Sequence, residues 1–208
     1  MELVRLFVDN KFNIQGVLNP WILILVLISV LAYLMISRHV LGKDYEINEA
    51  ELGIGSAKVK IKPNYEDLQI AYKLWVELAT RKIGLPIDPE HDVIDEIYNS
   101  WYEFFKITRE LIKSIPATKI RRNESTRKLV SISIDVLNSG IRPHLTKWQA
   151  RFRRWYELES RVDKNLGLSP QDIQKRFPDY QLLLKDLQSV NGNLIKYKNK
   201  LNDMVMGK

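Results

Sequence analysis

An uncharged apolar run from Trp21 to Ile36 constrains the fold of this chain more than any other feature, because its one clearly polar residue is Ser29. At a rise of about 1.5 Å per residue the run covers about 24 Å, and the apolar residues that flank it extend it to the roughly 30 Å of a bilayer core. Trp21 and Tyr33 are amphipathic rings of the kind found at headgroup depth, and Arg38 ends the run. The sequence therefore predicts one transmembrane helix over residues 20–41, the alternative being a buried helix in a soluble core.

Basic residues are denser after the run than before it. Arg5 and Lys11 are balanced by Glu2 and Asp9, whereas the following segment holds Arg38, His39, Lys43, Lys58, Lys60 and Lys62. Because positively charged segments stay on the cytoplasmic side, we expect an extracytoplasmic N-terminal segment over 1–19 and a cytoplasmic C-terminal part. The prediction is a single-pass protein of the inner (plasma) membrane whose weakly charged N-terminus is no cleaved signal peptide.

The rest of the chain predicts a mainly α fold: a juxtamembrane segment over 42–63 with a short β-hairpin, then a helical cytosolic domain over 64–208. The hairpin is indicated by two alternating stretches, Tyr45–Leu52 and Ala57–Lys62, on either side of Gly53–Ser56. Capping residues and prolines indicate helix starts at Asn64, at Asp88-Pro89, at Asn123 or Ser125, and at Ser169-Pro170. Gly140 and Pro143 should stop or kink the third of these helices.

A heptad-like seam follows over residues 179–205. Apolar side chains recur there at steps of three and four: Tyr180, Leu183, Leu187, Val190, Leu194, Tyr197, Leu201 and Met204. Such a seam either joins subunits or packs along its own domain.

The net charge of +7 is concentrated in residues 119–154. Within this basic region the aromatic residues of 144–156 lie on one helical face and the cations on the adjacent one. Rings of this kind stack on bases while arginines bind phosphates, which favours single-stranded nucleic acid or a nucleotide. The candidate ligand-binding residues are Lys119, Arg121, Arg122, Arg127, Lys128, Arg142, His144, Lys147, Trp148, Arg151, Arg153 and Arg154. The alternatives are an aromatic core and a solvated or salt-bridged cationic face.

Catalytic motifs are absent from the sequence. The chain has no cysteine and no Walker loop, dinucleotide fingerprint or HExxH pair, so we predict a protein that is not an enzyme and needs no cofactor. The acidic cluster from Asp88 to Glu96 could in principle ligate a metal. A solvated helix start explains it better, and no metal site is predicted.

Two hypotheses of function remain. In the first, an oligomeric membrane effector forms a channel that an anionic ligand gates through the basic region. Ser29, Tyr33 and Ser37 recur every four residues and are the candidate pore residues. In the second, the chain is a non-catalytic scaffold, tethered to the membrane, that docks a protein partner.

In its architecture the chain resembles the HalA membrane effectors of the bacterial Hailong anti-phage defence system. The resemblance lies in one N-terminal apolar run, a basic helical domain and no catalytic signature, and it extends over the whole chain without a shared residue motif. It implies a homo-oligomer, expected here as a tetramer or larger, that forms a channel in the membrane. It also implies a DNA oligomer as inhibitory ligand and a nucleotidyltransferase as the partner that makes it.

Overall fold

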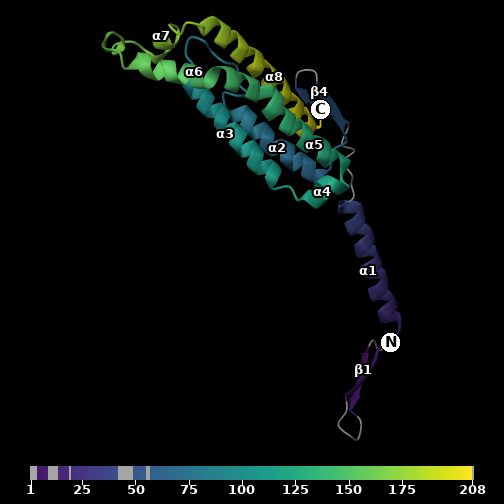
Figure 1. Cartoon of the computed structure of the whole chain (residues 1–208). Helices are drawn as coiled ribbons and strands as arrows, with labels where there is room; N and C mark the ends of the chain where they lie inside the picture. Colours follow the sequence, from purple (N-terminus) through teal and green to yellow (C-terminus); the bar gives the residue numbers. More distant parts are fainter. Residues whose placement is uncertain (1–3, 9–13, 19, 42–48, 55–56, 208) are drawn as a thin grey trace. The chain divides into compact units, whose positions relative to one another are not determined.

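The computed structural model describes residues 4–8, 14–18, 20–41, 49–54 and 57–207. Its contacts divide the chain into two units, Met1–Glu46 and Ile47–Lys208, and each unit is described by itself (Figure 1). Helices make up most of the described chain, together with two antiparallel two-stranded sheets.

The first unit begins with a hairpin that the sequence analysis did not predict. Strand β1 (Val4–Val8) pairs antiparallel with β2 (Ile14–Leu18), with Val4 opposite Leu18 and Val8 opposite Ile14. Helix α1 (Pro20–Leu41) follows, and large apolar side chains between Ile24 and Met35 are exposed along it.

The predicted transmembrane helix is contradicted. Helix α1 forms over the expected residues, but among the residues that the structure describes no helix is both long and apolar enough to cross a membrane. A span requires about 20 consecutive, mostly apolar residues. The fold class is therefore corrected to a mainly helical fold with short antiparallel sheets.

The second unit starts with the hairpin expected around Gly53. Strand β3 (Ala50–Ile54) pairs antiparallel with β4 (Ala57–Ile61), with Ala50 opposite Ile61. The earlier part of the expected first strand, over 45–48, lies outside the described residues, as do 55–56 at the turn. Leu52 and Ile61 are buried, whereas Lys60 is exposed, as the alternation of side chains along a strand requires.

Helix α2 (Tyr65–Thr80) begins at the predicted cap. The Asn64 side chain accepts a hydrogen bond from the Asp67 backbone N–H (2.9 Å), and the Asp67 carboxylate accepts one from the Asn64 N–H (3.1 Å). This reciprocal capping box satisfies two backbone donors that would otherwise lack partners.

Helix α8 (Tyr180–Met206) packs along α2, and its heptad-like seam faces the interior of its own unit (Figure 1). All the seam residues are buried except Val190, which is half-buried. Of the two roles considered for the seam, packing within the domain is the one observed.

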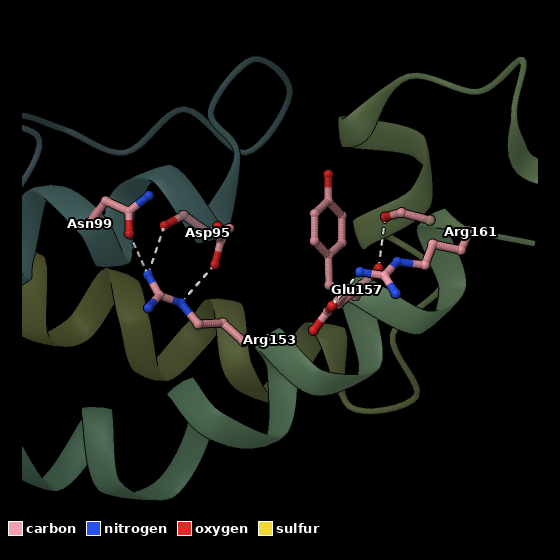
Figure 2. A pocket seen from close by; sticks show the side chains of 7 residues that line it. Asp95, Asn99, Arg153, Glu157 and Arg161 are labelled. Atoms are coloured by element: carbon pink, nitrogen blue, oxygen red, sulfur yellow. Dashed lines mark hydrogen bonds and ion pairs between the residues drawn. The ribbon is translucent and has the colours of Figure 1, made fainter.

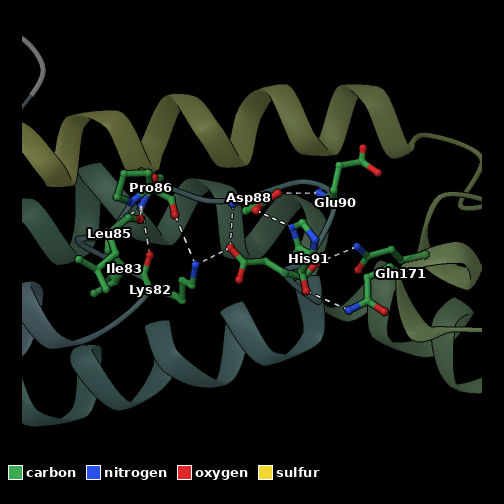
Figure 3. A network of polar contacts seen from close by, with 11 residues as sticks. Lys82, Ile83, Leu85, Pro86, Asp88, Glu90, His91 and Gln171 are labelled. Atoms are coloured by element: carbon green, nitrogen blue, oxygen red, sulfur yellow. Dashed lines mark hydrogen bonds and ion pairs between the residues drawn. The ribbon is translucent and has the colours of Figure 1, made fainter.

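Helix α3 (Ile94–Lys113) starts later than the Asp88-Pro89 signal predicted, because side chains from α8 and α7 (Pro170–Gln174) hold the preceding loop. Asn191 donates to the carbonyls of Lys82, Ile83 and Leu85 at 2.9 to 3.2 Å. Gln174 donates to the Asp92 carbonyl and accepts from the Ile94 N–H, both at 2.9 Å. Figure 3 shows this loop and its polar contacts. Backbone groups that would bond along a helix are thus satisfied by distant side chains.

The basic region forms α4 (Ala117–Arg122), α5 (Glu124–Asp135), a π-helical segment (η1, Val136–Ile141) and α6 (Arg142–Ser160). Asn123 caps α5, as one of the two alternatives predicted. The expected break at Gly140 and Pro143 is instead the π-segment, at whose end the Arg142 N–H donates to the Leu137 carbonyl five residues back. The chain stays helical through Pro143, so α5 and α6 run on from each other (Figure 1).

Candidate anion-binding site

The aromatic face of α6 belongs to the core. His144, Trp148 and Phe152 are buried, and the Phe152 ring contacts Phe177 edge-on at 5.4 Å and stacks on Tyr156 at 5.5 Å between centroids. The Phe152 ring is thus packed against other aromatic rings of the protein. Two roles were considered for these aromatic residues, a surface that stacks on bases and an aromatic core. The structure displays the aromatic core.

His144 and Trp148, two of the candidate ligand-binding residues, share one carboxylate partner. The His144 Nδ1 lies 2.8 Å from the Asp186 Oδ2, the Trp148 indole donates to the same oxygen at 2.9 Å, and the His144 Nε2 lies 3.2 Å from the Tyr98 hydroxyl. Burial lowers the pKa of His144 and outweighs the opposing effect of Asp186. Burial alone would raise the pKa of Asp186, but the hydrogen bonds from His144 and Trp148 lower it. Burial therefore favours a neutral imidazole, whose hydrogen bonds link α3, α6 and α8.

This network predicts a loss of stability in acid. His144 ordinarily titrates near 6.5, and its pKa is lower in the folded chain, so the unfolded state binds the proton first as the pH falls. The stability that the neutral ring contributes is therefore present above about pH 6.5 and is lost below it, by up to about 1.4 kcal/mol per pH unit. Urea denaturation between pH 7.5 and 5.5 measures this slope. We expect His144→Gln to flatten the slope and His91→Gln, in the exposed loop, to leave it intact; equal slopes in both variants would contradict the prediction.

Most cations of α6 already have partners. Arg153 Nε lies 2.7 Å from Asp95, Arg151 pairs with Asp179, and Arg142 donates to the Asn138 side chain at 3.1 Å. The Lys147 ammonium lies 4.7 Å from the centre of the Trp148 ring. Arg154 is exposed and forms no ion pair with any residue that the structure describes. In the second half of the basic region, Arg151 and Arg153 are thus paired with carboxylates, Arg142 with an amide and Lys147 with a ring.

A pocket of about 450 Å³ lies between the start of α3 and the end of α6 (Figure 2). Arg153 is held there by Asp95 and by the Asn99 side chain (2.5 Å), and Arg161 donates to Glu157 at 2.5 Å. Each guanidinium in the pocket thus faces a carboxylate. Because the charges balance, this pocket gives an anion no net attraction.

The first half of the basic region differs. We call Arg121 and Arg122 at the end of α4 and Arg127 on α5 the basic elbow; all three side chains are exposed, and none forms an ion pair with a described residue. The neighbouring Lys119 and Lys128 are paired with Glu66 (2.5 Å) and Glu124 (2.7 Å). These two pairs are on the surface, where such contacts contribute little and exchange easily with another anion.

A second pocket, of about 370 Å³, lies beside the elbow, where β4, the start of α2 and the start of α5 meet. Its lining residues are Glu49, Lys60, Ile61, Lys62, Asn64, Asn123, Glu124, Ser125 and Lys128. Lys60 and Lys62 are exposed and unpaired among the described residues. From the sequence these two lysines contributed only to the predicted membrane orientation. Their spacing of two across the end of β4, with Lys62 directly after the strand, was the signal that both side chains share one face.

A buried carboxylate fixes the geometry of this region. Asp67 of α2 is fully buried and accepts hydrogen bonds from the Thr126 hydroxyl (2.7 Å) and from the Ser125 hydroxyl at the start of α5. Lys128 adds a contact from its ammonium to the Lys60 carbonyl at 3.4 Å. Helices α2 and α5 and strand β4 are therefore joined where the elbow begins, so that its cations extend from a rigid base.

The other candidate residues lie elsewhere. In α1 the Ser29 hydroxyl donates to the Val26 carbonyl at 2.9 Å and Tyr33 is exposed, whereas the Ser37 side chain lies outside the described residues. Within the acidic cluster Asp88 contacts His91 (2.7 Å) and Asp92 contacts Lys82 (2.8 Å). No group of three potential metal ligands converges within the described parts of the chain.

Comparisons with known proteins add no family to these observations. No protein-family model, no curated protein and no solved structure matches this chain.

Proposed function

We propose that the helical unit binds a phosphate-bearing anionic ligand, single-stranded nucleic acid in particular, through the basic elbow. The observation that supports this is the contrast between the two halves of the basic region. The cations of α6 mostly have protein partners, whereas Arg121, Arg122 and Arg127 are exposed without one among the described residues. Guanidinium groups in that state are suited to bidentate contacts with phosphates.

The spacing of the charges favours an extended ligand. The three arginines occupy two successive helices, and the pocket lysines Lys60, on β4, and Lys62, directly after it, line the pocket where β4 contacts α5. Arg154 adds little to this site, because about 40 Å separate it from Arg127 along α5, the π-segment and α6. A chain of phosphates could follow the elbow into the pocket, while a compact anion would contact a fraction of these cations.

Ligand binding is the part of the effector hypothesis for which the structure supplies an observation. Self-association, channel formation, a role in anti-phage defence and a partner nucleotidyltransferase stay predictions. In this proposal the chain is a binding protein and not an enzyme. Docking of an acidic protein on the same cations is the competing outcome, and absence of oligonucleotide binding in the experiment below would favour it.

We expect the full-length chain to bind a fluorescent single-stranded oligonucleotide of about 12 nucleotides, with affinity falling steeply between about 50 and about 200 mM salt. Arg121→Ala, Arg122→Ala and Arg127→Ala together should weaken binding about tenfold or more at the lower salt. They should also reduce the slope of log affinity against log salt by about 2, because three phosphate contacts are lost from a single strand. Fluorescence anisotropy measures both quantities.

The matched control removes three other exposed cations: Arg154→Ala, Lys164→Ala and Lys185→Ala. Arg154 is on α6, Lys164 precedes α7 and Lys185 is near the start of α8; like the elbow arginines, they form no ion pair within the described chain. The same total charge is removed, so an equal loss in both triple variants would show nonspecific attraction and contradict the site. Absence of binding at the lower salt would contradict the function.

A further inference from the structure

We infer that the pocket beside the elbow accepts a terminal phosphomonoester of the bound strand, while the elbow arginines bind the phosphodiesters that follow. This inference rests on the proposed function and specifies which part of the ligand the site recognises. It is carried by the convergence of Lys60, Lys62 and Lys128 on one pocket of about 370 Å³ next to the arginines.

The phosphate at the end of a strand differs in charge from the phosphates within it. A phosphomonoester carries about −1.5 to −2 at neutral pH, whereas an internal phosphodiester carries a single negative charge. The pocket concentrates lysine ammonium groups, which are compact and strongly hydrated point charges, and the elbow presents the planar forks of arginine. An excess of lysine over glutamate within a concavity suits the doubly charged end, and spaced guanidinium groups suit the diesters.

The pocket lysines differ in their ion pairing. Lys60 and Lys62 are exposed and unpaired among the described residues, whereas Lys128 binds Glu124 (2.7 Å). Glu49 and Glu124 also line the pocket and oppose an anion there. Because the Lys128 to Glu124 pair is at the surface, an entering phosphate can replace that carboxylate as the partner of Lys128. Lys60 and Lys62 are therefore the residues on which the preference should depend.

The surroundings of the pocket hold its polar groups in place. Asn64 and Asn123 cap α2 and α5, and both helices start at the pocket with their positive dipole ends. The Asn123 side chain accepts hydrogen bonds from the Ser125 N–H (3.0 Å) and the Ser125 hydroxyl (2.8 Å). Buried Asp67 is not part of the lining, but it accepts hydrogen bonds from the lining residues Asn64 and Ser125 and so fixes their positions.

The test compares three oligonucleotides with the full-length chain at one salt concentration. The first has a 5′-phosphate, the second has the same sequence with a 5′-hydroxyl, and the third has a 5′-hydroxyl and two more nucleotides, which supply the same added charge as diesters. We expect the phosphorylated strand to bind about tenfold more tightly than either control strand. Lys60→Ala with Lys62→Ala should abolish this ratio, and Lys164→Ala with Lys185→Ala should retain it.

The outcomes are distinct. Equal binding of the phosphorylated strand and the longer hydroxyl strand would overturn the terminal-phosphate inference while leaving the proposed function standing. A preference that survives Lys60→Ala with Lys62→Ala would overturn the assignment to this pocket. Failure of all three strands to bind would overturn the proposed function and this inference with it.

Discussion

Replacement of Gly84 by alanine is expected to destabilise the helical unit by about 3 kcal/mol or more. A Cβ atom at this buried position would lie 2.2 Å from the Leu78 carbonyl oxygen and 2.8 Å from its carbon. Both are backbone atoms near the end of α2, so no side-chain rotation can relieve the clash. The Gly84 carbonyl also accepts a hydrogen bond from the Lys198 ammonium at 2.9 Å, which fixes the loop from its other side.

Gly192 provides the matched control. It lies inside α8, and a Cβ atom there meets nothing within 4 Å. Because glycine in a helix interior is less favourable than alanine, Gly192→Ala should stabilise the chain by about 0.5–1 kcal/mol. Urea denaturation followed by far-UV circular dichroism measures both changes. Equal effects of the two substitutions would contradict the close approach of the loop to α2.

The starts of the helices show where sequence reasoning succeeded and failed. Caps at Asn64, Asn123 and Ser169 were predicted correctly, because a cap is decided by residues within one helical turn of each other. The start of α3 was predicted too early, because its preceding loop is held by Gln174 and Asn191, which are distant in sequence. A local proline and acidic signal cannot report such partners.

The apolar patterns predicted which segments form helices with a shared apolar face, but not what covers that face. The seam of α8 was recognised from its spacing, and the structure buries it against its own unit. The run in α1 was recognised as a helix, yet its assignment as a membrane span was wrong for the described residues. Spacing determines which side chains share a face, whereas what covers that face depends on elements elsewhere in the chain.

The basic region was located from the sequence, but its division into two halves was not. Several paired cations meet a carboxylate far away in the chain, as with Lys119 and Glu66 or Arg151 and Asp179. Counting charges along the sequence therefore gave a site that was too long. The cations left at the elbow, together with Lys60 and Lys62 at the end of β4, could be selected only when the fold placed α5 against β4.

Phe152→Ala is expected to cost about 3–5 kcal/mol of stability, since it removes a fully buried ring from the aromatic core. The ring contacts Tyr98, Tyr156 and Phe177, which come from α3, from α6 itself and from the segment after α7. Its removal leaves a cavity bordered by all three segments. Leu158→Ala is the control on the same helix, because Leu158 is 58% exposed and should change stability by less than about 0.5 kcal/mol.

The Phe152 variant also separates the two interpretations of the α6 aromatics. If these rings stacked on bases, Phe152→Ala would weaken oligonucleotide binding and leave stability nearly unchanged. With the rings in the core and the ligand at the basic elbow, the opposite pattern is expected: a large loss of stability, with affinity within about twofold under conditions where the variant remains folded. Urea denaturation and fluorescence anisotropy on the same preparation decide between them, and weakened binding at native stability would restore the stacking surface.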